Sequence, residues 1–110
     1  MKSSLPTEKS TSCVKMTVMI LGDKWTPLLI SALLDGTRRF SELQESIKGL
    51  NPRTLSARLD MLKELGIINK KIYAVTPPKV EYSLTQKGID LYPVLQKMES
   101  WGQKYSKTVN

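Results

Sequence analysis

The sequence predicts a mainly α-helical domain that carries one small β-hairpin, an α+β fold. Apolar residues recur at three- and four-residue spacing in several stretches, which indicates helices. Two runs rich in β-branched and aromatic residues flank a Pro-Pro pair, which indicates a hairpin. With 110 residues and 40% hydrophobic content, the chain suits one compact domain. We expect this domain over residues 13–106, between a polar, flexible arm (1–12) and a short tail (107–110).

Two short helical patterns come first along the chain. They end at Gly22 and Gly36, since glycine readily adopts the left-handed conformation that closes a helix. Pro27 suits the start of the second helix, where a missing N–H costs little. We expect both helices to pack into the core through their apolar residues, which are Val14, Val18, Met19 and Leu21 in the first and Trp25, Leu28, Leu29, Ala32 and Leu33 in the second.

A third helix is expected from near Ser41 to Gly49. Phe40, Leu43 and Ile47 give it an apolar side, and the string Ser-Glu-Leu-Gln from Ser41 fits a capping box. A further helix follows directly after a short turn that contains glycine. Two helices joined in this way are typical of a helix-turn-helix, in which the first braces the second.

The fourth helix is predicted from Pro52 to Leu65. Asn51 is a suitable N-cap, Pro52 suits the first helical position, and Gly66 suits the end. One face carries leucines, and the opposite face places basic and small side chains in the first turns and acids in the last, a pattern suited to a major groove. Taken alone, this helix fits an ordinary solvated amphipathic face better, so the helix by itself does not decide its function. The opposite face and its flanks comprise Arg53, Thr54, Ser56, Ala57, Arg58, Asp60 and Glu64.

The hairpin is predicted from Ile67–Tyr73 and Val80–Leu84, with a stiff tip at Pro77 and Pro78. Lys70, Lys71 and Lys79 would place a cluster of positive charge beside the fourth helix. The hairpin therefore resembles the wing of a winged helix-turn-helix.

Charge is concentrated in the same part of the chain. The net charge is +7, and residues 38–79 hold nine Lys and Arg against four Asp and Glu. Arg38 and Arg39 open this stretch, and we expect them near DNA phosphates. A basic stripe is expected of a polyanion binder, although many ribosomal, membrane-surface and other soluble proteins are also basic.

The last segment begins with Thr85 as a helix cap, and Pro93 should split or kink the helix near Tyr92. Its apolar stripe must be covered either by the domain's own core or by a second subunit, and we favour a homodimer. Two copies of the fourth helix would then read two half-sites. The stripe comprises Leu91, Leu95, Met98, Trp101 and Tyr105.

The order of these motifs closely resembles the HxlR-type regulators, a branch of winged helix-turn-helix proteins near the MarR group. The resemblance covers Cys13 to Trp101. It rests on the string Gly-Asp-Lys-Trp from Gly22, Arg-Arg-Phe-Ser-Glu-Leu from Arg38, the leucine-rich fourth helix from Leu55, Val-Glu-Tyr-Ser-Leu-Thr from Val80, and the closing Trp101-Gly102.

The resemblance implies a homodimeric, DNA-binding transcriptional regulator. In such proteins the first and last helices form the dimer interface, which adds Val14 and Val18 to the apolar stripe of the last helix. Arg53, Thr54, Ser56, Ala57 and Arg58 fall in the reading helix. Arg58 lies nearer the apolar border than Arg53, so a structural ion pair or a phosphate contact fits it as well as base readout.

Cys13 occupies the position where several branches of this family carry a cysteine just before the first helix. The resemblance implies that its oxidation or modification by an electrophile switches DNA binding. A nearby helix N-terminus and Lys15 would favour the reactive thiolate. Many relatives have proline after this cysteine, whereas this chain has Val14. The other interpretation is a small buried apolar residue.

Other classes of function fit less well. The chain has no His, no glycine-rich phosphate loop and no cluster of metal ligands, so we expect no enzyme, metal or cofactor. Asp23, Asp35, Asp60 and Glu64 look like caps, turn residues or solvated charges. No stretch is long and apolar enough to cross a bilayer, so we expect a cytoplasmic protein without a membrane partner. Two alternatives remain. One is a DNA-binding regulator controlled by a small molecule at the dimer interface, and the other is a winged helix used only for protein interaction.

Overall fold

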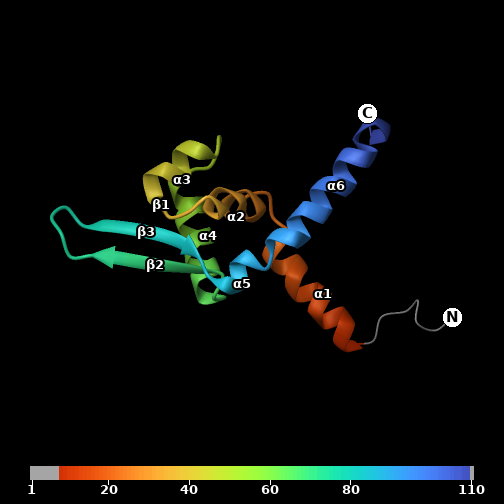
Figure 1. Cartoon of the computed structure of the whole chain (residues 1–110), viewed down its shortest axis with the longest axis horizontal. Helices are drawn as coiled ribbons and strands as arrows, with labels where there is room; N and C mark the ends of the chain where they lie inside the picture. Colours follow the sequence, from red (N-terminus) through yellow and green to blue (C-terminus); the bar gives the residue numbers. More distant parts are fainter. Residues whose placement is uncertain (1–7, 110) are drawn as a thin grey trace.

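The computed structural model describes residues 8–109 and shows a winged helix-turn-helix body from which two helices project (Figure 1). The hairpin extends from one end of the body, and the N- and C-terminal helices diverge from the other. The elements in order are α1 (Glu8–Leu21), α2 (Thr26–Leu34), β1 (Arg38–Arg39), α3 (Phe40–Ser46), α4 (Pro52–Glu64), β2 (Ile68–Tyr73), β3 (Lys79–Leu84), α5 (Gln86–Ile89) and α6 (Tyr92–Val109).

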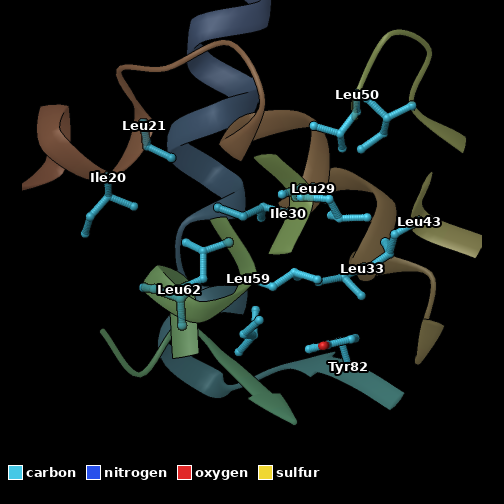
Figure 2. Packing of buried hydrophobic residues seen from close by; sticks show 14 of the residues in the cluster. Ile20, Leu21, Leu29, Ile30, Leu33, Leu43, Leu50, Leu59, Leu62 and Tyr82 are labelled. Atoms are coloured by element: carbon cyan, nitrogen blue, oxygen red, sulfur yellow. The ribbon is translucent and has the colours of Figure 1, made fainter. Parts of the chain in front are cut away.

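The core lies where α2, α3 and α4 meet the sheet (Figure 2). Side chains from α2 and α4 fill its centre, and Tyr82 of β3 closes it from the sheet side. Because these side chains are shielded from water, their burial fixes how the three helices cross. The fully buried apolar residues include Leu29, Ile30, Leu43, Leu55, Leu59, Leu62 and Ile67.

The predicted start and end of α4 are confirmed. Asn51 Oδ1 accepts a hydrogen bond from the Thr54 N–H at 2.8 Å, and Pro52 is the first helical residue. After the helix, Gly66 adopts a φ of +74°, a conformation that other residues rarely tolerate. These signals are local in the sequence, which is why they could be read without the fold.

The start of α3 differs from the prediction. The helix begins at Phe40, and the Arg39 N–H donates to Glu42 Oε1 at 2.8 Å. The reciprocal capping bond therefore involves Arg39 and Glu42, not Ser41 and Gln44 as expected. The reason is that Arg39 ends strand β1 in an extended conformation, which moves the helix start one residue upstream.

The sheet has three strands in the order β1-β3-β2, all antiparallel. The predicted hairpin is confirmed as β2 and β3. The short strand β1 was not predicted, since two residues are too few to show a period-two pattern. It pairs Arg38 with Tyr82 and Arg39 with Glu81, which anchors the segment before α3 to the wing.

The first helix departs most from expectation. Residues 8–12, expected in a flexible arm, are helical, while residues 1–7 lie outside the described part of the chain. The prediction that its apolar stripe packs into the core is wrong for Val14, Val18 and Met19, which are exposed. Among the side chains of α1 that the structure describes, residues 12–21, those of Ile20 and Leu21 reach the core, because α1 leaves the body at that point.

The C-terminal segment is split as Pro93 predicted. α5 ends at Ile89, and α6 begins at Tyr92 with Pro93 as its second residue. α6 then runs to Val109, so residues 107–109 of the expected tail are helical. Over residues 8–109 no single helix is long and apolar enough to span a membrane. Ser12–Leu21 of α1 and Thr26–Leu34 of α2 reach that length and composition together, but they are bent by 78° relative to each other.

Candidate nucleic-acid interface and N-terminal thiol

The outward face of α4 presents the residues that the sequence assigned to DNA reading. Arg53, Ser56 and Ala57 are exposed, and Thr54 is partly buried. Three leucines on the opposite face hold the helix against the core, so this face is kept outward. The first turns of α4 can therefore approach a groove without rearrangement of the body.

Arg58 takes a different direction from Arg53. Its Nε lies 3.8 Å from Asp23 Oδ1, in the loop between α1 and α2, and its Nη1 lies 3.8 Å from Met61 Sδ. The side chain is 35% exposed, but Nε itself is buried and has no hydrogen-bond acceptor among the described residues. Of the three interpretations left open for Arg58, which were an ion pair, a phosphate contact and base readout, the ion pair is the contact present in this structure.

Asp23 is held firmly by the start of α2. Its Oδ1 accepts hydrogen bonds from the N–H groups of Trp25 and Thr26, both at 2.8 Å, and its Oδ2 accepts one from the Thr26 hydroxyl at 2.6 Å. Partial burial works to raise the pKa of Asp23, but these bonds and the positive charge of Arg58 outweigh it and lower the pKa. Asp23 thus acts as a cap, one of the roles that the sequence left open for it, and it also contacts Arg58 of α4.

One face of the wing gathers cations around an aromatic ring. The register pairs Lys71 with Glu81 and Tyr73 with Lys79, and directly paired residues of antiparallel strands share a face. The Nζ atoms of Lys71 and Lys79 each lie 4.9 Å from the centre of the Tyr73 ring. Lys79 also contacts Glu81 at 3.3 Å, so its charge is partly neutralised.

Glu81 is the acid within this group. A hydrogen bond from the Tyr73 side chain is the main cause that lowers its pKa, and the charges of Lys79 and Arg39 act in the same direction. The carboxylate therefore stays ionised and offsets part of the positive charge of the wing. Neither Tyr73 nor Glu81 was assigned to the site from the sequence. The signal for Glu81 was its position two residues after Lys79, since residues two apart in a strand lie on the same face.

Lys70 lies on the other face of the wing. It pairs with Tyr82, as does Arg38 of β1, so both share the face that turns toward the core, and both are partly buried. Arg39 is exposed on the same face as Lys71 and Glu81. The predicted wing cluster is therefore divided, with Lys71, Lys79 and Arg39 on one side and Lys70 and Arg38 on the other.

An apolar groove of about 420 Å³ lies between α1 and α6. Cys13 lines it and is exposed. The cysteine lies inside α1, where its carbonyl accepts a hydrogen bond from the Thr17 hydroxyl at 3.1 Å, and not before the helix as expected. The helix N-terminus therefore lies more than a turn away, which removes that argument for a reactive thiolate. The groove is lined by Cys13, Val14, Thr17, Val18, Leu21, Gly22, Val94 and Met98.

The expected dimer residues fall into two groups. Val14, Val18, Met98, Trp101 and Tyr105 are exposed, with Trp101 68% accessible. Leu95 is buried, and Leu91 packs against the core. In this structure the base of α6 contacts α2 before the helix leaves the body, so Leu95 lies in the core and Leu91 is partly covered by it.

The described residues contain no group of three or more His, Cys, Asp or Glu side chains that could hold a metal ion. The site is instead a set of cationic and small side chains on a helix and a hairpin. Such an arrangement suits contact with phosphates and base edges.

Comparison with known proteins agrees with this geometry. The model of the HxlR-like helix-turn-helix family matches residues 20–110. The uncharacterised HTH-type transcriptional regulator YdeP of Bacillus subtilis is 39% identical over 97 residues, which cover 88% of this chain and 76% of YdeP. The HTH-type transcriptional regulator YodB of the same species is 37% identical over 98 residues, 87% of this chain and 88% of YodB.

Solved structures show the same fold. The redox regulator HypR in its reduced form superposes with a TM-score of 0.82 at 34% identity, covering 87% of this chain and 95% of HypR. Reduced YodB gives a TM-score of 0.76 at 34% identity, with 92% and 95% covered. The chain is thus an HTH-type transcriptional regulator and belongs to the HxlR-like helix-turn-helix family.

Proposed function

We propose that the protein binds operator DNA as a homodimer, with α4 in the major groove and the wing on the adjacent backbone. The observation that carries the proposal is the exposed first turn of α4, with Arg53, Ser56 and Ala57, in a body whose wing presents Lys71 and Lys79. Small side chains allow α4 to approach the bases, while Arg53 supplies donors to a base edge. Lysines on the wing supply charge to phosphates.

The test is a salt titration of duplex binding, with the operator obtained by selection from random duplexes. Binding should weaken steeply as salt rises, because phosphate contacts release counterions. Arg53→Ala should lower the discrimination between operator and random duplex, whereas Lys71→Ala should weaken both about equally.

Lys63→Ala is the matched control, since it removes one exposed charge from the last turn of α4. It should change neither affinity nor discrimination much. Identical behaviour of the Arg53 and Lys71 variants would contradict the division between reading helix and wing. Salt-independent or undetectable duplex binding would favour a winged helix used for protein interaction.

We also propose that Cys13 controls this binding. Two observations support it: the thiol is exposed beside an apolar groove, and the similar protein HypR has structures in reduced and oxidised forms, as YodB has reduced and diamide-treated forms. Since the chain has one cysteine, an intrachain disulfide is excluded. Two Cys13 thiols of a dimer can form an intersubunit disulfide, giving two electrons and two protons to diamide; thiolation and alkylation are the other routes.

Diamide or a quinone should change the operator affinity of the unmodified protein, and Cys13→Ser should abolish the change. A response that persists in Cys13→Ser contradicts control by the thiol. No response of the unmodified protein to either reagent would favour the second candidate, a small apolar effector in the groove between α1 and α6, whose lining is almost wholly apolar. Mass measurement of the treated protein distinguishes disulfide, mixed disulfide and adduct.

A further inference from the structure

The guanidinium of Arg58 lies at the border between the reading face of α4 and the loop that joins α1 to α2. Its Nε is buried 3.8 Å from Asp23 Oδ1, without a hydrogen bond, and Nη1 turns toward Met61. About a third of the side chain remains exposed. Arg58 is therefore drawn toward the body by charge, although its donors stay largely unused.

The carboxylate of Asp23 cannot follow Arg58 outward. Three hydrogen bonds from Trp25 and Thr26 occupy both of its oxygens and fix it to the start of α2. Thr26 is fully buried, so this anchor does not move without disturbing the core. The restraint on Arg58 is thus stationary, and the guanidinium either stays beside it or leaves it for another anion.

A DNA phosphate is the competing anion. Arginine binds phosphate best through two parallel N–H bonds, and Asp23 at 3.8 Å provides no such pair. A free Arg58 on the flank of α4 would reach phosphates of any sequence, since phosphate contacts carry no sequence information. Each added contact of this kind strengthens binding to random DNA as much as binding to an operator.

We propose that Asp23 withholds Arg58 from the DNA backbone and so limits the part of the DNA affinity that does not depend on sequence. Asp23 acts here as a positioning residue, because it touches the reading helix and not the DNA. The inference rests on the proposed DNA binding and adds a role for the loop before α2, a part of the chain that does not belong to the helix-turn-helix itself.

The test compares Asp23→Asn, Arg58→Gln and the double variant on operator and random duplexes over a range of salt. Asp23→Asn keeps a side-chain oxygen for the cap but removes the charge. We expect tighter binding to operator and random duplex by about the same factor, an unchanged operator-to-random ratio, and a salt slope steeper by about one ion. Arg58→Gln alone should leave the slope unchanged, and the double variant should return to the slope of the unmodified protein.

Glu64→Gln is the matched control, since it removes one exposed acid from α4 away from Arg58. If the salt slope rises equally in Glu64→Gln, the effect comes from the change in net charge alone, and the proposal is overturned. A salt slope that is shallower by about one ion in Arg58→Gln alone would also overturn the proposal. It would show that Arg58 already contacts a phosphate in the unmodified protein. This second variant decides the question even where Asp23→Asn folds poorly.

The proposed function and the role of Asp23 can be contradicted separately. If the unmodified protein binds no duplex, the proposed function fails and this inference falls with it. If the unmodified protein binds duplex with the expected salt dependence while Asp23→Asn keeps its salt slope and its affinity for random duplex, only the role of Asp23 is wrong.

Discussion

At the scale of single residues, Asp23 joins three parts of the fold. It caps α2, it lies in the loop that follows α1, and it faces Arg58 on α4. The sequence indicated the first of these roles, because an acid shortly before a helix is a familiar cap. It gave no sign of the third, since residues 23 and 58 meet only after α2 and α4 have packed together.

The cap predicts a stability effect that depends on pH. The free energy of unfolding should fall by about 1 to 2 kcal/mol in Asp23→Ala at neutral pH, because two N–H groups and a buried hydroxyl lose their acceptor. The pKa of Asp23 is lowered in the folded state from its ordinary 3.8. Its ionised form therefore stabilises the fold at pH values above about 3.8, and this contribution is lost as the pH falls through the folded pKa.

Urea unfolding of both proteins at pH 7 and near pH 3, at one protein concentration, measures this contribution. The difference between Asp23→Ala and the unmodified protein should shrink at the lower pH. A difference that is the same at both values would show that the charge of Asp23 adds nothing to the cap.

At the scale of elements, the base of the wing is fastened to the end of α4. The Thr85 hydroxyl donates to the carbonyls of Gly66 and Ile67 at 2.6 and 3.0 Å, and Lys87 Nζ donates to the Leu65 carbonyl at 2.7 Å. These bonds satisfy carbonyls that the helix end leaves free. They also hold the reading helix and the hairpin at a fixed separation.

Gly88 is the residue that allows this close approach. A Cβ at this position would collide with the Ile67 carbonyl oxygen and press on the Leu84 side chain. We expect Gly88→Ala to lower the free energy of unfolding by about 1 to 3 kcal/mol, since the crowded atom is backbone and cannot turn aside. Thermal unfolding measures the loss.

Gly102→Ala is the control for Gly88→Ala. It is also a glycine within a helix, but a Cβ there meets no described atom outside its own helix turn within 4 Å. Stability should be unchanged or rise by up to about 1 kcal/mol, because alanine favours helix. Equal losses in both variants would mean that the contact with Ile67 does not limit the fold.

Elements were predictable where their signals are local. α4 and the hairpin follow from caps, glycines and periodicity within a few residues. β1 could not be predicted, because its only support is the pairing of Arg38 and Arg39 with a strand more than forty residues away. The wing lysines were found, but their division between two faces depends on the strand register, which the sequence did not reveal.

At the scale of the whole molecule, α1 and α6 leave the body in different directions (Figure 1). Both helices carry apolar side chains that the body does not cover. The sequence identified these stripes, but periodicity alone cannot tell whether a helix is covered by its own core or by another chain. Ile20, Leu21 and Leu95 belong to the core, whereas Val14, Val18, Met98 and Trp101 are left exposed, as expected for a surface that pairs with a second copy.

The dimer can be tested by placing one charge on this surface. Val18 of α1 is 58% exposed, so Val18→Asp should leave the subunit folded while it brings a carboxylate into an apolar interface. Sedimentation should then show a monomer, and operator affinity should fall by at least tenfold, because two half-sites are no longer bound together. Ile72→Asp is the control, since Ile72 is 65% exposed on the wing and its change should leave the dimer intact. A dimer that survives Val18→Asp would place the interface elsewhere.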